Sequence, residues 1–168
     1  MFDPTILARE TVRAAVTGSP LPVPPQDIAP EWLRPGGAFV SIKKKGALRG
    51  CLGTLTPSTP SLVEEIVQNA VGSATRDLRF TPITHDELED LTFSVDVLEL
   101  PETVSSLEKL DPKIFGVIVE AGNRRGLLLP DLEGVETVED QVAIARQKAG
   151  IAPGEPVILS RFRVARYR

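Results

Sequence analysis

Apolar residues recur at helical spacing in three stretches of the chain, residues 3–18, 59–74 and 137–150. Each stretch opens on an Asp or Thr side chain that can cap a helix, and a glycine ends the first and the last. In the first two, proline follows the capping residue, where its missing N–H group costs nothing. We therefore predict three helices, the second starting at Thr59-Pro60, each with one apolar face toward a core.

Alternation of apolar and polar residues is clearest in residues 91–97, the pattern of a half-buried strand. Residues 43–46 and 122–125 are typical of hairpin turns between further strands. The predicted strands are residues 37–42, 47–52, 91–97, 114–120, 126–129 and 158–167. Hairpin-connected strands mixed with helices favour an α/β chain of the α+β type, with a largely antiparallel sheet and flanking helices.

Two segments follow neither rhythm. Residues 19–36 contain six prolines and predict an extended connector, with Ile28 and Trp32 as its anchors on the core. Thr84 and Glu87 match a capping box that starts a short acidic helix. There is no internal repeat, and 168 residues are enough for one domain with a real core, so residues 1–168 are taken as a single domain.

Composition narrows the class of protein. The chain is 42% hydrophobic and 25% charged, and no apolar run reaches the roughly 20 residues of a membrane span. The N-terminus lacks the pattern of a secretory signal, and the lone Cys51 excludes an internal disulfide, so a cytoplasmic location is expected. A net charge of -4 argues against a general nucleic-acid binder.

Cys51 is the strongest candidate for chemistry. In an extended strand Arg49 and Cys51 project on the same face, and a neighbouring guanidinium favours the reactive thiolate. Gly50 and Gly53 remove side chains around it, which allows a ligand or a second backbone to approach closely. The alternative is a buried cysteine that packs as a small hydrophobic residue.

The blocks at residues 37–42, 48–53, 77–82, 126–135 and 145–151 resemble, in order, the AMMECR-type domain family. The hallmark is the second block, Leu48-Arg49-Gly50-Cys51-Leu52-Gly53, and the last two blocks look like the prokaryotic branch called AmmeMemoRadiSam system protein A. The resemblance implies an α/β fold with a larger and a smaller lobe, and a cleft lined by the hallmark segment. It also implies a Memo-like protein and a radical-SAM protein as partners. It does not indicate which reaction the protein catalyses, if any.

Other residues add little chemistry. Asp77 and Arg79 follow a predicted helix and can bring charge toward Cys51, although a structural ion pair is equally compatible. His85 lies in the first turn of a capped helix and is interpreted as a surface residue rather than a base for Cys51. One Cys and one His give no zinc pattern, and the glycine spacing fits no nucleotide motif, so neither metal nor cofactor is predicted.

Two hypotheses remain open on the sequence alone. The first is an enzyme, or an enzyme component, in which Cys51 and Arg49 act in a cleft lined by Gly50, Gly53, Asp77 and Arg79. The second is a non-catalytic interaction or regulatory module, in which the segment around Cys51 is a structural turn or a docking surface.

Overall fold

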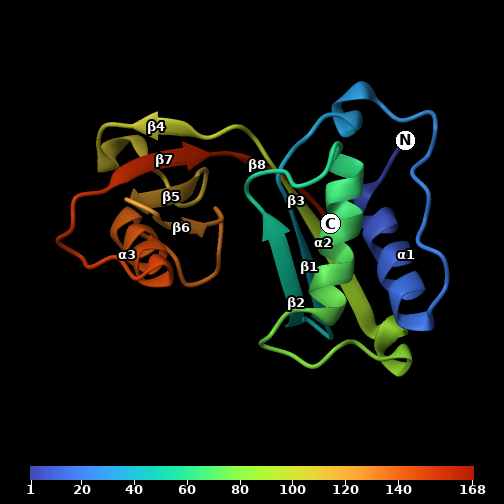
Figure 1. The fold of residues 1–168 in the computed structure, drawn as a ribbon. Helices are drawn as coiled ribbons and strands as arrows, with labels where there is room; N and C mark the ends of the chain where they lie inside the picture. The colour runs from blue at the N-terminus through green and yellow to red at the C-terminus, as the bar shows by residue number, and fades with distance from the viewer. The chain divides into compact units, whose positions relative to one another are not determined.

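Three helices and eight strands build the chain, and the computed structural model describes all of residues 1–168 (Figure 1). The helices are α1 (Pro4–Thr17), α2 (Leu62–Thr75) and α3 (Val138–Ala149). The strands are β1 (Ala38–Lys44), β2 (Ala47–Thr54), β3 (Leu91–Leu98), β4 (Glu102–Val104), β5 (Gly116–Ala121), β6 (Arg124–Leu128), β7 (Ile158–Phe162) and β8 (Val164–Tyr167). Single 3-10 turns are η1 (Pro30–Leu33), η2 (His85–Asp90) and η3 (Leu107–Lys109). The predicted α+β class is confirmed, but the strands form two antiparallel sheets of four strands, not one.

The ends of α1 and α3 follow the predicted capping residues. The Asp3 carboxylate accepts a hydrogen bond from the Thr5 N–H at 2.8 Å, and the Thr137 side chain caps α3 in the same way. Gly18 and Gly150 end the two helices with φ angles of 71° and 69°. Glycine suits these positions because it enters the left-handed region without a steric penalty.

Helix α2 begins later than predicted. Ser61 is its capping residue and Leu62 its first residue, so Thr59-Pro60 lies before the helix. The Thr59 hydroxyl donates to the Ser61 carbonyl and to Glu65 inside α2. Thr59 therefore fixes the approach to the helix without capping it.

Residues 1–98 and 165–168 form the first of two compact units. Its sheet has the strand order β2-β1-β3-β8, and α1 and α2 lie side by side on one face of it (Figure 1). The connector 19–36 is held by the predicted anchors, since Ile28 packs on the core and Trp32 is buried between the rings of Phe2 and Tyr167. The fully buried core side chains here are Val12, Val40, Ile42, Val63, Ile66 and Val95.

The β1–β2 hairpin carries the segment around Cys51. Its turn is the pair Lys45-Gly46 with φ angles of 50° and 84°, the left-handed values of a two-residue hairpin turn. A β-bulge interrupts the pairing between Ile42 and Lys43, and Arg49 is the extra residue of β2 at that point. The bulge takes Arg49 out of the regular alternation that the sequence predicted.

Residues 99–164 form the second unit. Its sheet has the order β4-β7-β5-β6, and α3 packs on β5 and β6. A Cβ atom on Gly126 would lie 1.9 Å from the Ala145 carbonyl oxygen, so glycine is required where α3 meets β6. Strand β4 was not predicted, and the predicted strands around residues 122–125 are shifted, because the turn is only Gly122-Asn123.

The prediction of one final strand over residues 158–167 was wrong. This segment forms two strands separated at Arg163, with β7 in the second sheet and β8 in the first. The Arg163 carbonyl accepts a hydrogen bond from Glu99, and its guanidinium lies 4.8 Å from the centre of the Phe115 ring. Alternation of side chains runs on through residue 163, so the sequence pattern contained no sign of the change of sheet.

Candidate functional site

Strand β2 lies at the edge of its sheet. The backbone N–H and carbonyl of Cys51 point away from β1, so no neighbouring strand binds them. The Cys51 N–H donates to the Asp77 carboxylate at 2.9 Å, and the Cys51 carbonyl accepts from the Arg79 guanidinium at 3.2 Å. An open edge can pair with another chain, and side chains that occupy its backbone groups prevent that. Asp77 and Arg79 thus lie beside the Cys51 segment and also form an ion pair with each other at 2.7 Å, so the structure contains both arrangements that the sequence left open.

The turn from Asp77 to Phe80 is fixed by its own hydrogen bonds. The Asp77 carboxylate accepts from the Arg79 backbone N–H at 3.1 Å and from its guanidinium at 3.0 and 2.7 Å, and the Asp77 carbonyl accepts from Phe80 at 3.0 Å. The bond from Arg79, helped by that from Cys51, holds the pKa of the buried Asp77 carboxyl well below its usual range. Leu78, at the tip of this turn, is 100% exposed.

The Cys51 thiol is half-buried on the sheet face opposite α2. Its sulfur lies 3.1 Å from the Ser41 hydroxyl of the paired strand. Burial raises the pKa of Cys51, and the opposing effects of the Ser41 hydroxyl and the Arg79 charge are smaller. The prediction that Arg49 would favour the thiolate was wrong, because the guanidinium that acts on Cys51 belongs to Arg79 and burial outweighs it.

Arg49 is engaged elsewhere. Its Nε and Nη2 donate to the two Glu87 carboxylate oxygens at 2.9 and 3.0 Å, and its Nη1 donates to the Thr81 carbonyl at 2.8 Å. The bond from Arg49, with further bonds from Thr84 and Lys44, holds the pKa of Glu87 well below its usual range. Glu87 also completes the predicted capping box with Thr84, so Arg49 ties the bulge of β2 to the start of η2.

The two glycines of the hallmark segment are close to protein atoms. A Cβ atom on Gly50 would lie 2.1 Å from the carbonyl oxygen of Ser73 in α2. A Cβ atom on Gly53 would lie 2.2 Å from the ring of Phe39 on β1. Of the two roles left open by the sequence, close approach of a second backbone therefore applies at Gly50, and an aromatic ring occupies the space at Gly53.

Helix α2 contains a row of buried polar residues that was not predicted from the sequence. Glu65, Asn69 and Ser73 follow one another at four-residue spacing and are 0%, 6% and 2% exposed. Asn69 donates to the Ala38 carbonyl, and the Ser73 hydroxyl donates to Val40 and accepts from Leu52, so α2 is hydrogen-bonded to both strands of the hairpin. The spacing of four along one helix edge is the signal that could have revealed it.

Glu65 closes the same row with a hydrogen-bonded carboxylate. It accepts from the hydroxyls of Thr54, Ser58 and Thr59 and from the backbone N–H groups of Ser58 and Thr59. Burial alone would raise the pKa of Glu65, but these bonds outweigh burial and the pKa lies below its usual value. The carboxylate thus fixes the loop that joins β2 to α2.

The remaining candidates have surface positions. The His85 side chain is 77% exposed, as predicted for a surface residue. No three His, Cys, Asp or Glu side chains lie close enough together to hold a metal ion. None of the helices combines the length and the apolar character that a membrane span needs.

These features define a class of protein: a two-unit α+β chain whose Cys51 segment is an edge strand closed by the turn that follows α2. The chain belongs to the AMMECR1 family, whose model matches residues 5–168.

A protein from Thermotoga maritima is 51% identical to it over 87% of this chain and 86% of the relative. Protein CA_C1420 from Clostridium acetobutylicum is 46% identical over 99% of this chain, which spans only 36% of that relative. The crystal structure of the uncharacterized protein PH0010 from Pyrococcus horikoshii superposes with a TM-score of 0.88 at 32% identity, covering 97% of this chain and 88% of that one.

Proposed function

We propose that this chain is a non-catalytic protein-binding module, and that the turn Asp77–Phe80 is its recognition element. The observation that carries the proposal is Leu78, a fully exposed leucine whose two neighbours are both fixed by hydrogen bonds. Because the backbone on both sides of Leu78 is already fixed, docking of this side chain in a partner's pocket requires little ordering of the turn. A side chain that fills a well-packed, fully desolvated pocket of the partner carries a large share of the binding energy.

The charges around Leu78 specify the chemistry of the partner. Arg76 and Arg79 are exposed on either side of it, and the Arg79 side chain keeps 57% of its surface in solvent. The matching surface is an apolar socket with acidic residues at its rim.

The partners we propose are the Memo-like and the radical-SAM protein of the prokaryotic system whose protein A branch this chain resembles, working together in the cytoplasm. In the Clostridium relative, the region similar to this chain makes up 36% of a longer polypeptide, which is compatible with a module that works beside other protein segments.

The module proposal predicts that Leu78→Ala weakens binding to one of these two proteins at least tenfold, the loss expected when an interface anchor is truncated. Leu100→Ala is the matched control, because Leu100 is 93% exposed and lies outside the turn. Biolayer interferometry with each purified partner measures both variants. The proposal is contradicted if the native chain binds neither of the two proteins, or if Leu78→Ala and Leu100→Ala weaken binding equally.

An enzyme using Cys51 is the second candidate. It is favoured by the position of the Ser41 hydroxyl, 3.1 Å from the Cys51 sulfur, because this group and the Arg79 charge partly offset the rise in the pKa of Cys51 that burial causes. Cys51 would then be the nucleophile and Arg79, rather than Arg49, the group that stabilises its thiolate. The protonation state of Cys51 at neutral pH decides between the two candidates.

A further inference from the structure

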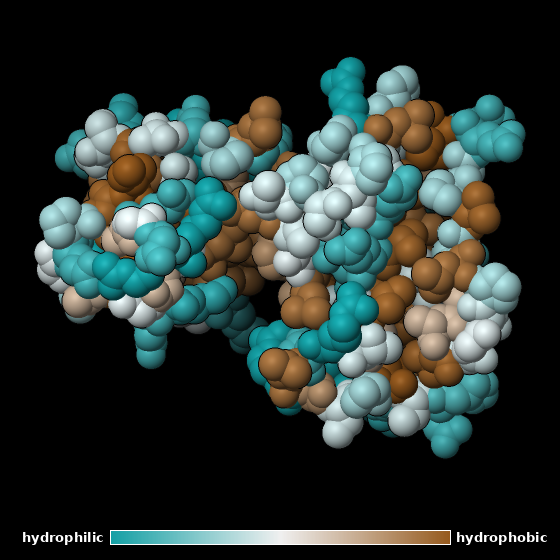
Figure 2. All heavy atoms as spheres, viewed as in Figure 1, coloured by the Kyte–Doolittle hydropathy of each residue, from teal (hydrophilic) through white to brown (hydrophobic).

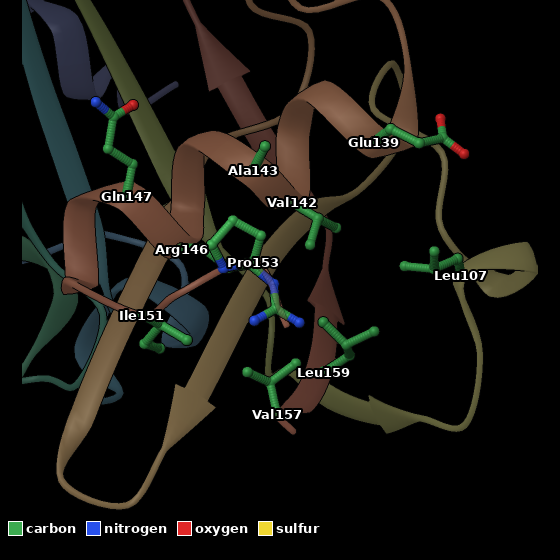
Figure 3. Close-up of a pocket in the computed structure, with 10 residues that line it drawn as sticks. All are labelled: Leu107, Glu139, Val142, Ala143, Arg146, Gln147, Ile151, Pro153, Val157 and Leu159. Atoms are coloured by element: carbon green, nitrogen blue, oxygen red, sulfur yellow. The ribbon is translucent and has the colours of Figure 1, made fainter. Parts of the chain in front are cut away.

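The second unit contains a pocket that none of the predicted site residues touches. It has a volume of about 700 Å³ and lies between α3, β7 and η3 (Figure 3). Its lining includes Val142 of α3, Leu107 of η3, Leu159 of β7 and Val157, which directly precedes β7. Figure 2 shows hydrophobic residues on the surface between η3 and α3.

The width of the sheet explains why the pocket exists. Four strands at about 4.8 Å spacing span roughly 19 Å, whereas one helix with its side chains covers only about 10–12 Å. Helix α3 packs on β5 and β6, so the same face of β7 and β4 is left without a helix above it. Leu159 of β7 and Val157 just before it are consequently half-exposed, although both pack against the apolar core of this unit.

One polar group points into this apolar space. In Figure 3 the Arg146 guanidinium is directed toward Val157 and Leu159, whereas the Glu139 carboxylate and the Gln147 amide point away. The Nη1 of Arg146 donates to the carbonyls of Ala152 at 2.8 Å and Glu155 at 3.0 Å, which fixes the guanidinium and leaves its Nε and Nη2 for another acceptor.

The nearest carboxylate is already paired. Glu155 binds the Arg124 guanidinium through both of its oxygens and accepts from the Ala152 N–H, so it does not occupy the free edge of Arg146. An oriented guanidinium with two adjacent donors matches a carboxylate, which can accept both bonds at once.

From this geometry we propose that the pocket binds an aliphatic carboxylate, with the chain between Val142 and Leu159 and the carboxylate on Arg146. The volume lies in the range of about 300–1,000 Å³ found for small-molecule sites, which are mostly apolar with a few placed polar groups. Glu139, at the other end of the helix face, disfavours the reverse orientation of an anion.

Decanoate, used below its micelle concentration, tests the proposal on the ¹⁵N-labelled chain by NMR. We expect saturable shifts of the Val142, Ala143 and Leu159 amide signals, and affinities at least tenfold weaker for decan-1-ol and for decylammonium. Arg146→Gln should weaken decanoate binding at least tenfold. Ala143→Trp should abolish it by filling the pocket while the Arg146 side chain itself is retained.

Ala47→Trp is the control, because Ala47 is equally an exposed alanine but lies in the first unit. It should leave decanoate binding unchanged. The proposal fails if decanoate causes no saturable shifts, if decan-1-ol or decylammonium binds as tightly, or if Ala143→Trp still binds. Self-association that covers these residues in place of decanoate binding also overturns it.

Discussion

Gly50→Ala is expected to lower the free energy of unfolding by about 3 kcal/mol, because no space exists for the added methyl group. The new Cβ would stand 2.1 Å from the Ser73 carbonyl oxygen, and a backbone atom of α2 cannot rotate away as a side chain could. The helix must move off the β1–β2 hairpin, which weakens the bonds that Ser73 makes to the two strands.

Calorimetry of Gly50→Ala measures this loss as a fall in melting temperature of roughly 6–12 °C. Gly154→Ala is the control, since a Cβ at Gly154 meets no atom within 4 Å and its φ angle lies outside the left-handed region. A melting temperature of Gly50→Ala equal to that of Gly154→Ala would show that α2 does not rest on β2 as described.

Asp77→Asn is expected to destabilise the first unit by about 2 kcal/mol at neutral pH. All four groups that bond to the Asp77 carboxylate are N–H donors, so the new amide N–H₂ must face at least one of them. The Cys51 backbone N–H or the Arg79 guanidinium then loses its acceptor. Asp86→Asn is the control, since the Asp86 side chain is fully exposed.

The effect of Asp77→Asn depends on pH with a definite sign. Because the pKa of Asp77 is lowered in the folded chain, its contribution to stability is complete above the ordinary carboxyl pKa of about 4 and is lost as pH falls toward the lowered value. Urea unfolding should therefore separate native chain and variant at pH 7 and bring them together in strong acid. A difference that does not change with pH contradicts the ionised state assigned to Asp77.

Local sequence signals predicted the local structure well. Asp3 with Gly18 and Thr137 with Gly150 marked two helices because capping depends on a few adjacent residues. The Lys45-Gly46 turn likewise follows from the backbone angles that glycine tolerates.

The division into two sheets could not be predicted in this way. Alternation of side chains is the same on either side of Arg163, so the residues that pair with β7 and β8 are specified only by distant strands. The bulge at Arg49 has the same cause, because it concerns the match between two strands and not the sequence of one.

The candidate site was predicted in position but not in its contacts. The sequence indicated that Asp77 and Arg79 could reach the Cys51 segment, and their side chains bond there to the outer backbone N–H and carbonyl groups of Cys51. It assigned the guanidinium beside Cys51 to Arg49, two residues away on the same strand, whereas the guanidinium that bonds to Cys51 is that of Arg79, 28 positions away in the sequence. The Arg49 guanidinium is paired with Glu87, which lies 38 positions away in the sequence. The sequence predicted Glu87 only as a capping residue.

At the closed edge of β2 burial raises the pKa of the Cys51 thiol, and the pH dependence of thiol alkylation tests this most directly. We expect the rate of iodoacetamide labelling of Cys51 in the folded chain to rise with a midpoint above the ordinary thiol pKa of about 8.5. Arg79→Ala should raise that midpoint further and Arg49→Ala should leave it unchanged, because the charge that acts on Cys51 is that of Arg79. A midpoint below about 7.5 in the native chain would mean a thiolate at neutral pH, and would contradict the account in favour of a reactive Cys51.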